Sequence, residues 1–176
     1  MKTGKILIIV GAILALVSTF LLSFGQTNGT DGRTLSSGIG FLFNLPEIFG
    51  NVAYWNTFNG GETTLQYVFT VVFIIFVFSG VIQLVGVANK YLALIGSLIV
   101  IAFGIMMIIF IAVDTPGWGF NRYSSLLWRA PIGIIPFDVS LIDASGVFYQ
   151  TYSLGTFILI AGGALGLVGG ILEFKD

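Results

Sequence analysis

Four long apolar runs, each bounded by charged or strongly polar residues, dominate the pattern of side chains along the chain. A helix that crosses the hydrocarbon core of a bilayer needs roughly 20 apolar residues, because the core is about 30 Å thick. All four runs meet this requirement. The pattern predicts transmembrane helices at about residues 6–24, 64–86, 91–113 and 153–172.

The first run follows Lys2 and Lys5, as the apolar part of a secretory signal would. That part of a signal usually has about 7 to 15 residues, and this run is longer. We therefore expect the segment to remain attached as a membrane-spanning helix.

Two long segments, residues 25–62 and 114–152, join the predicted helices. Residues 136–152 alternate apolar and polar positions around turn-forming residues, which predicts a β-hairpin. Asn44 and Glu47 have the spacing of a helix start, so we expect a short helix from Asn44 at the membrane surface or under the loops, and a further strand at residues 38–45. The predicted fold class is an all-α membrane bundle, a single domain over residues 1–176, whose two outer loops carry small β-hairpin and short-helix structure.

The positions of the basic residues predict the orientation of the chain. Lysines lie in the short tails and in the tight turn between the second and third helices, whereas the long loops hold only arginines: Lys2, Lys5, Lys90 and Lys175 against Arg33, Arg122 and Arg129. Short cytoplasmic segments are enriched in basic residues. We expect a multi-pass protein of the plasma (cytoplasmic) membrane with cytoplasmic termini and both loops outside. An Asn-Gly-Thr sequence makes Asn28 a possible glycosylation site in the first loop.

The two halves of the chain resemble each other weakly. A shift of 85 residues places Lys5 over Lys90 and Gly11 over Gly96, and Tyr67 over Tyr152. This pattern indicates a duplication, residues 1–88 and 89–176, whose halves would be parallel because each contains two spans. Coincidence between apolar segments of limited alphabet is an equal alternative.

Composition narrows the class of protein further. The chain is 56% hydrophobic and 9% charged, and its mean hydropathy is +1.02, so it cannot form an ordinary water-soluble surface. The net charge is -1 and the basic residues are scattered, so we expect no nucleic acid among the partners. The expected partners include membrane lipids. The absence of cysteine and histidine excludes disulfides, thiolate metal sites and the commonest proton shuttle.

Side chains that could perform chemistry are sparse. The predicted spans contain no ionisable residue within their apolar parts, and Gln83 is expected to form a hydrogen bond between helices or at the membrane interface. The loop carboxylates show no metal-binding spacing, and we expect them to be solvated or paired with arginine: Asp31, Glu47, Glu62, Asp114, Asp138 and Asp143. We therefore expect no catalytic, cofactor or metal site, and no enzyme.

Small residues form strips in the first and last predicted helices. Gly162, Gly166 and Gly170 recur every four residues, and Gly11 and Ala15 form a shorter strip. Such strips let neighbouring helices approach closely. We expect packing inside the bundle, and contact between copies of the chain is the alternative.

Aromatic residues are abundant in the two loops. Those that we expect to contact other proteins are Phe41, Phe43, Phe49, Trp55, Trp128, Phe137 and Phe148. A small internal core beneath the loops is the alternative explanation.

The predicted topology resembles that of the four-helix claudin-type membrane proteins, and the near-equal loops resemble those of junction channels such as connexins and innexins. The resemblance covers the whole chain as topology. Tyr54 and Trp55 stand near the place of the claudin tryptophan, and the cysteines of both families are absent. The claudin likeness implies lateral assembly into strands and adhesion through the loops.

Together these patterns favour a non-catalytic protein with four spans that self-assembles, or scaffolds neighbours, through its outer loops and small-residue helix faces. Its partners would be a homo-oligomer or other membrane subunits. One alternative is an accessory or structural subunit of a larger membrane enzyme or respiratory complex. Another is a pore formed between protomers.

Overall fold

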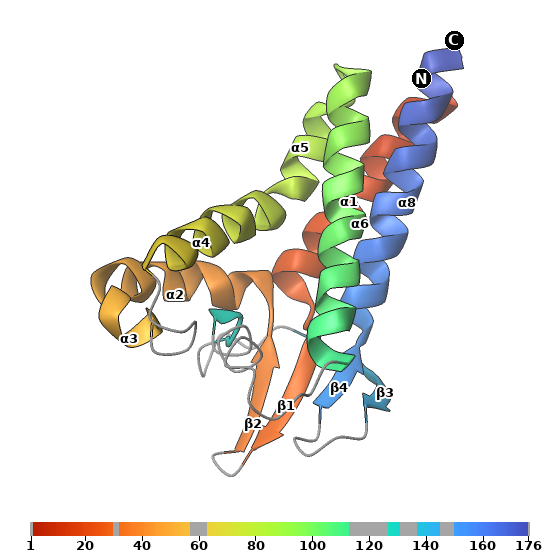
Figure 1. Cartoon of the computed structure of the whole chain (residues 1–176). Coiled ribbons are helices and arrows are strands. Elements are labelled where there is room, and N and C mark those ends of the chain that lie inside the picture. Colours follow the sequence, from red (N-terminus) through yellow and green to blue (C-terminus); the bar gives the residue numbers. More distant parts are fainter. Residues whose placement is uncertain are drawn as a thin grey trace.

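The computed structural model describes residues 2–29, 32–56, 63–112, 127–130, 137–144 and 150–175. Three long helices form the bundle: α1 (Thr3–Leu21), α6 (Lys90–Ala112) and α8 (Leu154–Lys175) (Figure 1). α8 packs along both α1 and α6. Each is long and apolar enough to cross a membrane, which supports a membrane-embedded protein.

The surface of these helices explains why they need an apolar environment. On α6, Ile95, Leu98, Ile105 and Ile109 follow a helical period and are each about half exposed. The opposite side of the same helix is buried at Ala93, Val100 and Phe103. Both sides of the helix are therefore apolar, as expected of a helix between protein and lipid.

The predicted second helix, residues 64–86, is present in the structure as two helices instead of one. The structure divides it into α4 (Thr63–Val77) and α5 (Ser79–Val85), which meet at a bend of 46°. Phe78 lies at the break with φ -89° and ψ 2°, and the Ser79 hydroxyl donates to the Phe76 carbonyl at 2.6 Å. Gly80 lets the backbone approach Leu16 of α1. A Ser-Gly pair of this kind is a known cause of helix kinks.

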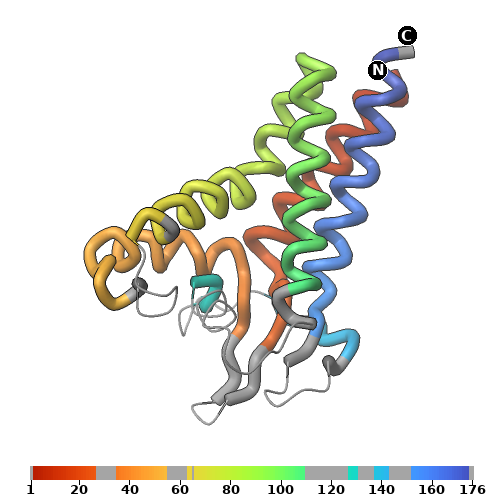
Figure 2. The backbone as a smooth tube through the Cα atoms, in the orientation of Figure 1, coloured from red at the N-terminus to blue at the C-terminus, as the bar shows by residue number. Residues whose placement is uncertain are grey.

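Because of this bend, α4 leaves the bundle and lies along two further helices, α2 (Gly38–Gly50) and α3 (Val52–Asn56) (Figures 1 and 2). We call α2, α3 and α4 the arm. α5 stays in the bundle and packs against α1 and α6.

The short helix of the first loop begins earlier than predicted. Ser37 is its N-cap, because the Ser37 hydroxyl accepts from the Gly40 amide at 3.2 Å. Asn44 lies inside α2 instead, where its amide donates to the Leu127 and Arg129 carbonyls at 2.9 and 3.2 Å. The strand predicted at residues 38–45 is therefore wrong. Gly40 fits here because its backbone lies against that of Trp128, where a β-carbon would have no room.

A four-stranded antiparallel sheet unites the two long loops. Its order is β2 (Gly32–Ser36), β1 (Gly25–Gly29), β4 (Gln150–Ser153), β3 (Ser140–Ala144). The β3–β4 pair confirms the hairpin predicted in the second loop. The β1–β2 pair and the central β1–β4 pairing, in which Gly25 lies opposite Tyr152, were not predicted.

The ends of the chain lie together. Both termini are at one end of the bundle, and the sheet, α2 and α3 are at the other (Figure 1). Residues 86–89 connect α5 to α6 at the end of the termini, and Gly86 allows this tight turn because its backbone contacts Ala93. Taken in the order α1, α4 with α5, α6 and α8, the described helices therefore run alternately toward and away from the end of the termini.

Candidate interaction surfaces

The small-residue strips of α1 and α8 lie inside the bundle. Gly11, Ala15, Gly162, Gly166 and Gly170 are all buried. A β-carbon at Gly11 would overlap the Gly162 carbonyl oxygen, and one at Gly170 would lie 2.7 Å from Leu94 of α6. The described residues of the same chain thus cover these glycines, and the strips leave no open face for a second copy.

Gln83 lies where α5 meets α1, α6 and α8. Its side chain is fully buried, and Nε2 donates to the Gly162 carbonyl oxygen at 3.1 Å, which confirms the hydrogen bond expected between helices. Gly11 and Gly166 lie closely against this side chain, and Gly96 lies against the backbone of Gln83. The amide of Gln83 is a neutral donor and acceptor, so its hydrogen bond fixes the relative position of the helices.

Two of the loop aromatics form an internal core where the arm, the bundle and the sheet meet. Phe41 and Trp128 stack with ring centres 4.7 Å apart, and both are buried. Phe24, Phe73 and Phe103 surround Trp128 at centroid distances of 6.1, 5.1 and 5.1 Å. Phe41 and Trp128 therefore join the arm to the bundle and are not accessible to a partner.

Other predicted contact residues are exposed. Phe43 and Phe49 on α2 are each 51% exposed, and Phe137 beside the sheet is 75% exposed. Trp55 belongs to α3, but its side chain lies outside the described part of the structure. Phe148 lies entirely outside it, and so does Thr30 of the possible glycosylation sequence. Asn28 lies in β1, and its side chain is likewise not described.

An apolar stripe runs along α4 and continues to Phe78 at the break. Val68, Val71, Ile75 and Phe78 are each between 42% and 54% exposed and recur at helical spacing. The other side of α4 is buried at Gln66, Thr70, Phe73 and Val77. Phe49 of α2 stacks on Tyr67 of α4 at 6.2 Å, so the two helices share one aromatic surface.

A polar cluster surrounds Asp138. The sequence analysis named Asp138 only as one of the loop carboxylates and did not predict this cluster. The carboxylate accepts hydrogen bonds from the hydroxyls of Ser23, Ser140 and Ser153, the last two at 3.1 and 2.6 Å. Ser23 and Ser153 are buried beside the ends of α1 and β4. This cluster ties the second loop to the bundle.

Tyr152 lies next to this cluster on β4. Its hydroxyl donates to the Ile108 carbonyl of α6 at 3.3 Å, and burial raises the pKa of its phenol above the ordinary value. Across the described residues, no group of three metal-binding side chains of the histidine, cysteine or carboxylate type occurs.

No family model, curated protein or solved structure matches the chain. The resemblance to claudin-type proteins and junction channels therefore stays a prediction, as does the internal duplication.

Proposed function

We propose that this chain is a non-catalytic membrane protein with four spans, α1, α4 with α5, α6 and α8, that assembles laterally with copies of itself through the arm. Its termini would lie in the cytoplasm and its sheet outside the plasma membrane. The observation that carries the proposal is the arm, which projects from the bundle and exposes aromatic and aliphatic side chains along its length (Figure 1).

The path of the chain supports the fourth span. α1 ends beside the sheet, whereas α6 begins at the end where the termini lie (Figure 1). The chain must therefore return from one end to the other between Leu21 and Lys90, and α4 with α5 makes this return. A bent helix can span a membrane where neighbouring helices and hydroxyl groups satisfy its freed carbonyls, as Ser79 does for Phe76.

The aromatic surface of the arm supports the role in assembly. Aromatic residues are enriched at the centres of protein interfaces, because they bury a large area with few rotatable bonds. Phe43, Phe49 and Tyr67 present such rings on neighbouring helices, and the glycine strips are already used within the bundle.

The test is the mass of the particle in lipid nanodiscs or a mild detergent, measured by light scattering. We expect one defined assembly that is a multiple of the 18.9 kDa chain. Phe49→Ala should shift the assembly toward smaller particles. Leu21→Ala is a matched control, because Leu21 is 52% exposed but lies on α1 outside the arm.

A native protein that remains a monomer at all concentrations would overturn the proposal. Purification with a fixed ratio of other chains would also overturn it and favour the accessory subunit. If Leu21→Ala disrupted the assembly as strongly as Phe49→Ala, the interface would not be the arm.

A further inference from the structure

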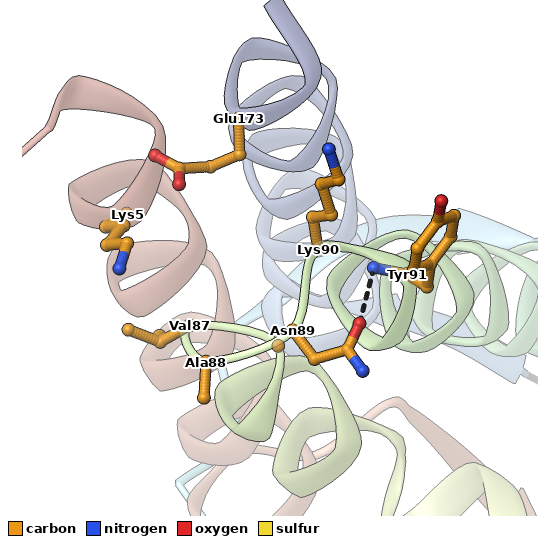
Figure 3. Close-up of a pocket in the computed structure, with 8 residues that line it drawn as sticks. Lys5, Val87, Ala88, Asn89, Lys90, Tyr91 and Glu173 are labelled. Atoms are coloured by element: carbon orange, nitrogen blue, oxygen red, sulfur yellow. Dashed lines mark hydrogen bonds between the residues drawn. The ribbon is translucent and has the colours of Figure 1, made fainter. Parts of the chain in front are cut away.

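A polar pocket of about 340 Å³ lies at the end of the bundle where the two termini meet. α1 contributes Lys5, α8 contributes Glu173, and α6 contributes Lys90 and Tyr91, while the turn of residues 86–89 forms the rest of the wall. Figure 3 shows the side chain of Glu173 extending from α8 toward α1, which bears Lys5, with Lys90 and Tyr91 on the other side. The pocket therefore lies between the first turns of α1 and α6, which bear Lys5 and Lys90, and the last turn of α8.

The lysines give the lining of the pocket a net positive charge, since Lys5 and Lys90 line it with one carboxylate, Glu173. The Lys90 Nζ atom lies 4.2 Å from the centre of the Phe174 ring, and Tyr91 packs edge-on against the same ring at 5.2 Å. These contacts hold Lys90 at the pocket wall. The Asn89 side chain accepts from the Tyr91 amide at 3.0 Å and fixes the start of α6 (Figure 3).

Glu173 is the unusual member of the pocket. Its Oε1 atom is buried and has no hydrogen-bond partner among the described residues. The carboxylate is pressed against α1, because a β-carbon at Gly4 would lie 2.8 Å from this oxygen. A carboxylate with one oxygen buried and without a donor is unfavourable, so an ammonium group that reached Glu173 from the pocket side would stabilise its charge.

We propose that this pocket binds a phosphoethanolamine group. Its phosphate would lie between the ammonium groups of Lys5 and Lys90, and its primary ammonium would donate to Glu173. Basic pockets between helices at the membrane boundary suit lipid headgroups, and this pocket lies at the ends of the three span-length helices. The expected source is a phosphatidylethanolamine lipid, and soluble phosphoethanolamine carries the same ammonium group on a phosphate monoester. The proposal does not depend on assembly through the arm.

Native mass spectrometry of the purified full chain can test this binding. The probes are dioleoyl phosphatidylethanolamine and dioleoyl phosphatidylcholine, which share acyl chains and phosphate but differ in the N–H donors of the headgroup. We expect the ethanolamine lipid to be retained about tenfold more strongly, as one charge-assisted hydrogen bond would give.

Variants separate the two halves of the site. Glu173→Gln should remove the preference between the two lipids while leaving retention of phosphate lipids. The pair Lys5→Met and Lys90→Met should weaken retention of both. Lys2→Met is the matched control, because Lys2 is at the same end but does not line the pocket. Circular dichroism would verify that each variant keeps its helices.

Competition identifies the source. If soluble O-phosphoethanolamine displaces the lipid, the headgroup alone is sufficient for binding; if only the lipid binds, its acyl chains also contribute. Equal retention of the two lipids by the native chain would overturn the proposal. So would unchanged lipid retention and preference after substitution of Lys5, Lys90 and Glu173.

Discussion

At the scale of the residue, Gly166 shows how little space the bundle leaves. A β-carbon there would overlap the Gln83 amide nitrogen and lie 2.5 Å from the Ser97 hydroxyl oxygen. Gln83 cannot withdraw without losing its hydrogen bond to Gly162. The absence of a side chain at Gly166 is therefore a requirement of the four-helix junction.

We predict that Gly166→Ala lowers the free energy of unfolding by about 1–3 kcal/mol, the range for overpacked cores, and that Gly166→Leu lowers it more. Thermal unfolding in detergent, followed by circular dichroism, would measure this. Gly50→Ala is the control, because a β-carbon at Gly50 meets nothing within 4 Å. A Gly166→Ala protein as stable as the native one would show that the junction is looser than the structure indicates.

At the scale of the element, the sheet depends on Asp138. Its carboxylate holds the buried hydroxyls of Ser23 and Ser153, and the neighbouring backbone continues this connection: the Ser23 amide donates to the Phe137 carbonyl at 3.0 Å. The Asp138 cluster thus connects the sheet with the end of α1.

We predict that Asp138→Ala destabilises the protein by about 1–3 kcal/mol, because two buried hydroxyls lose their acceptor. Limited proteolysis should then cut the second loop faster, while the helices remain protected. Ser140→Ala should have a smaller effect, because Ser140 is exposed and its hydroxyl is only one of the donors to Asp138. Equal proteolysis of Asp138→Ala and native protein would contradict this role.

The elements that depend on local pattern were predictable from the sequence. α1, α6 and α8 follow from their apolar runs, and the β3–β4 hairpin follows from alternation around a turn. The break at Phe78 was missed because residues 64–86 are uncharged and mainly apolar, so the pair Ser79 and Gly80 was the only local signal, and the bend also depends on the contact of Gly80 with Leu16. α2 was placed too late for a similar reason, since Gly38 and Gly40 serve close backbone contacts that a local pattern does not reveal.

The candidate surfaces show the same limit. The sequence identified the glycine strips and the loop aromatics as groups, but burial divides Phe41 and Trp128 from Phe43 and Phe49. That division depends on which face of α2 meets the bundle. The pocket of Lys5, Lys90 and Glu173 joins residues far apart along the chain, so only the packing of α1, α6 and α8 brings them together.

At the scale of the whole molecule, the alternating direction of the helices makes sidedness testable. The chain has no cysteine, so a single introduced thiol reports its own position without background. Ser140 and Ala88 are both exposed, one at the sheet and one in the turn at the opposite end.

We predict that Ser140→Cys reacts with a membrane-impermeant maleimide on intact cells, whereas Ala88→Cys reacts only after lysis. This result follows from the proposed four spans with the lysine-bearing segments in the cytoplasm. Labelling of both sites on intact cells would contradict the proposed four spans, and the reverse pattern would place the termini outside.

The projecting arm gives the molecule a tapered outline, broad beside the sheet and narrow at the termini (Figure 1). Tapered bodies that touch along their broad parts cannot tile a flat plane, because their narrow parts incline toward one another. If copies associate through the arm, a patch of them would therefore impose curvature on the bilayer, with the termini on the concave side. The bend of 46° at Phe78 would then determine the radius of curvature of the bilayer, a length far larger than the protein itself.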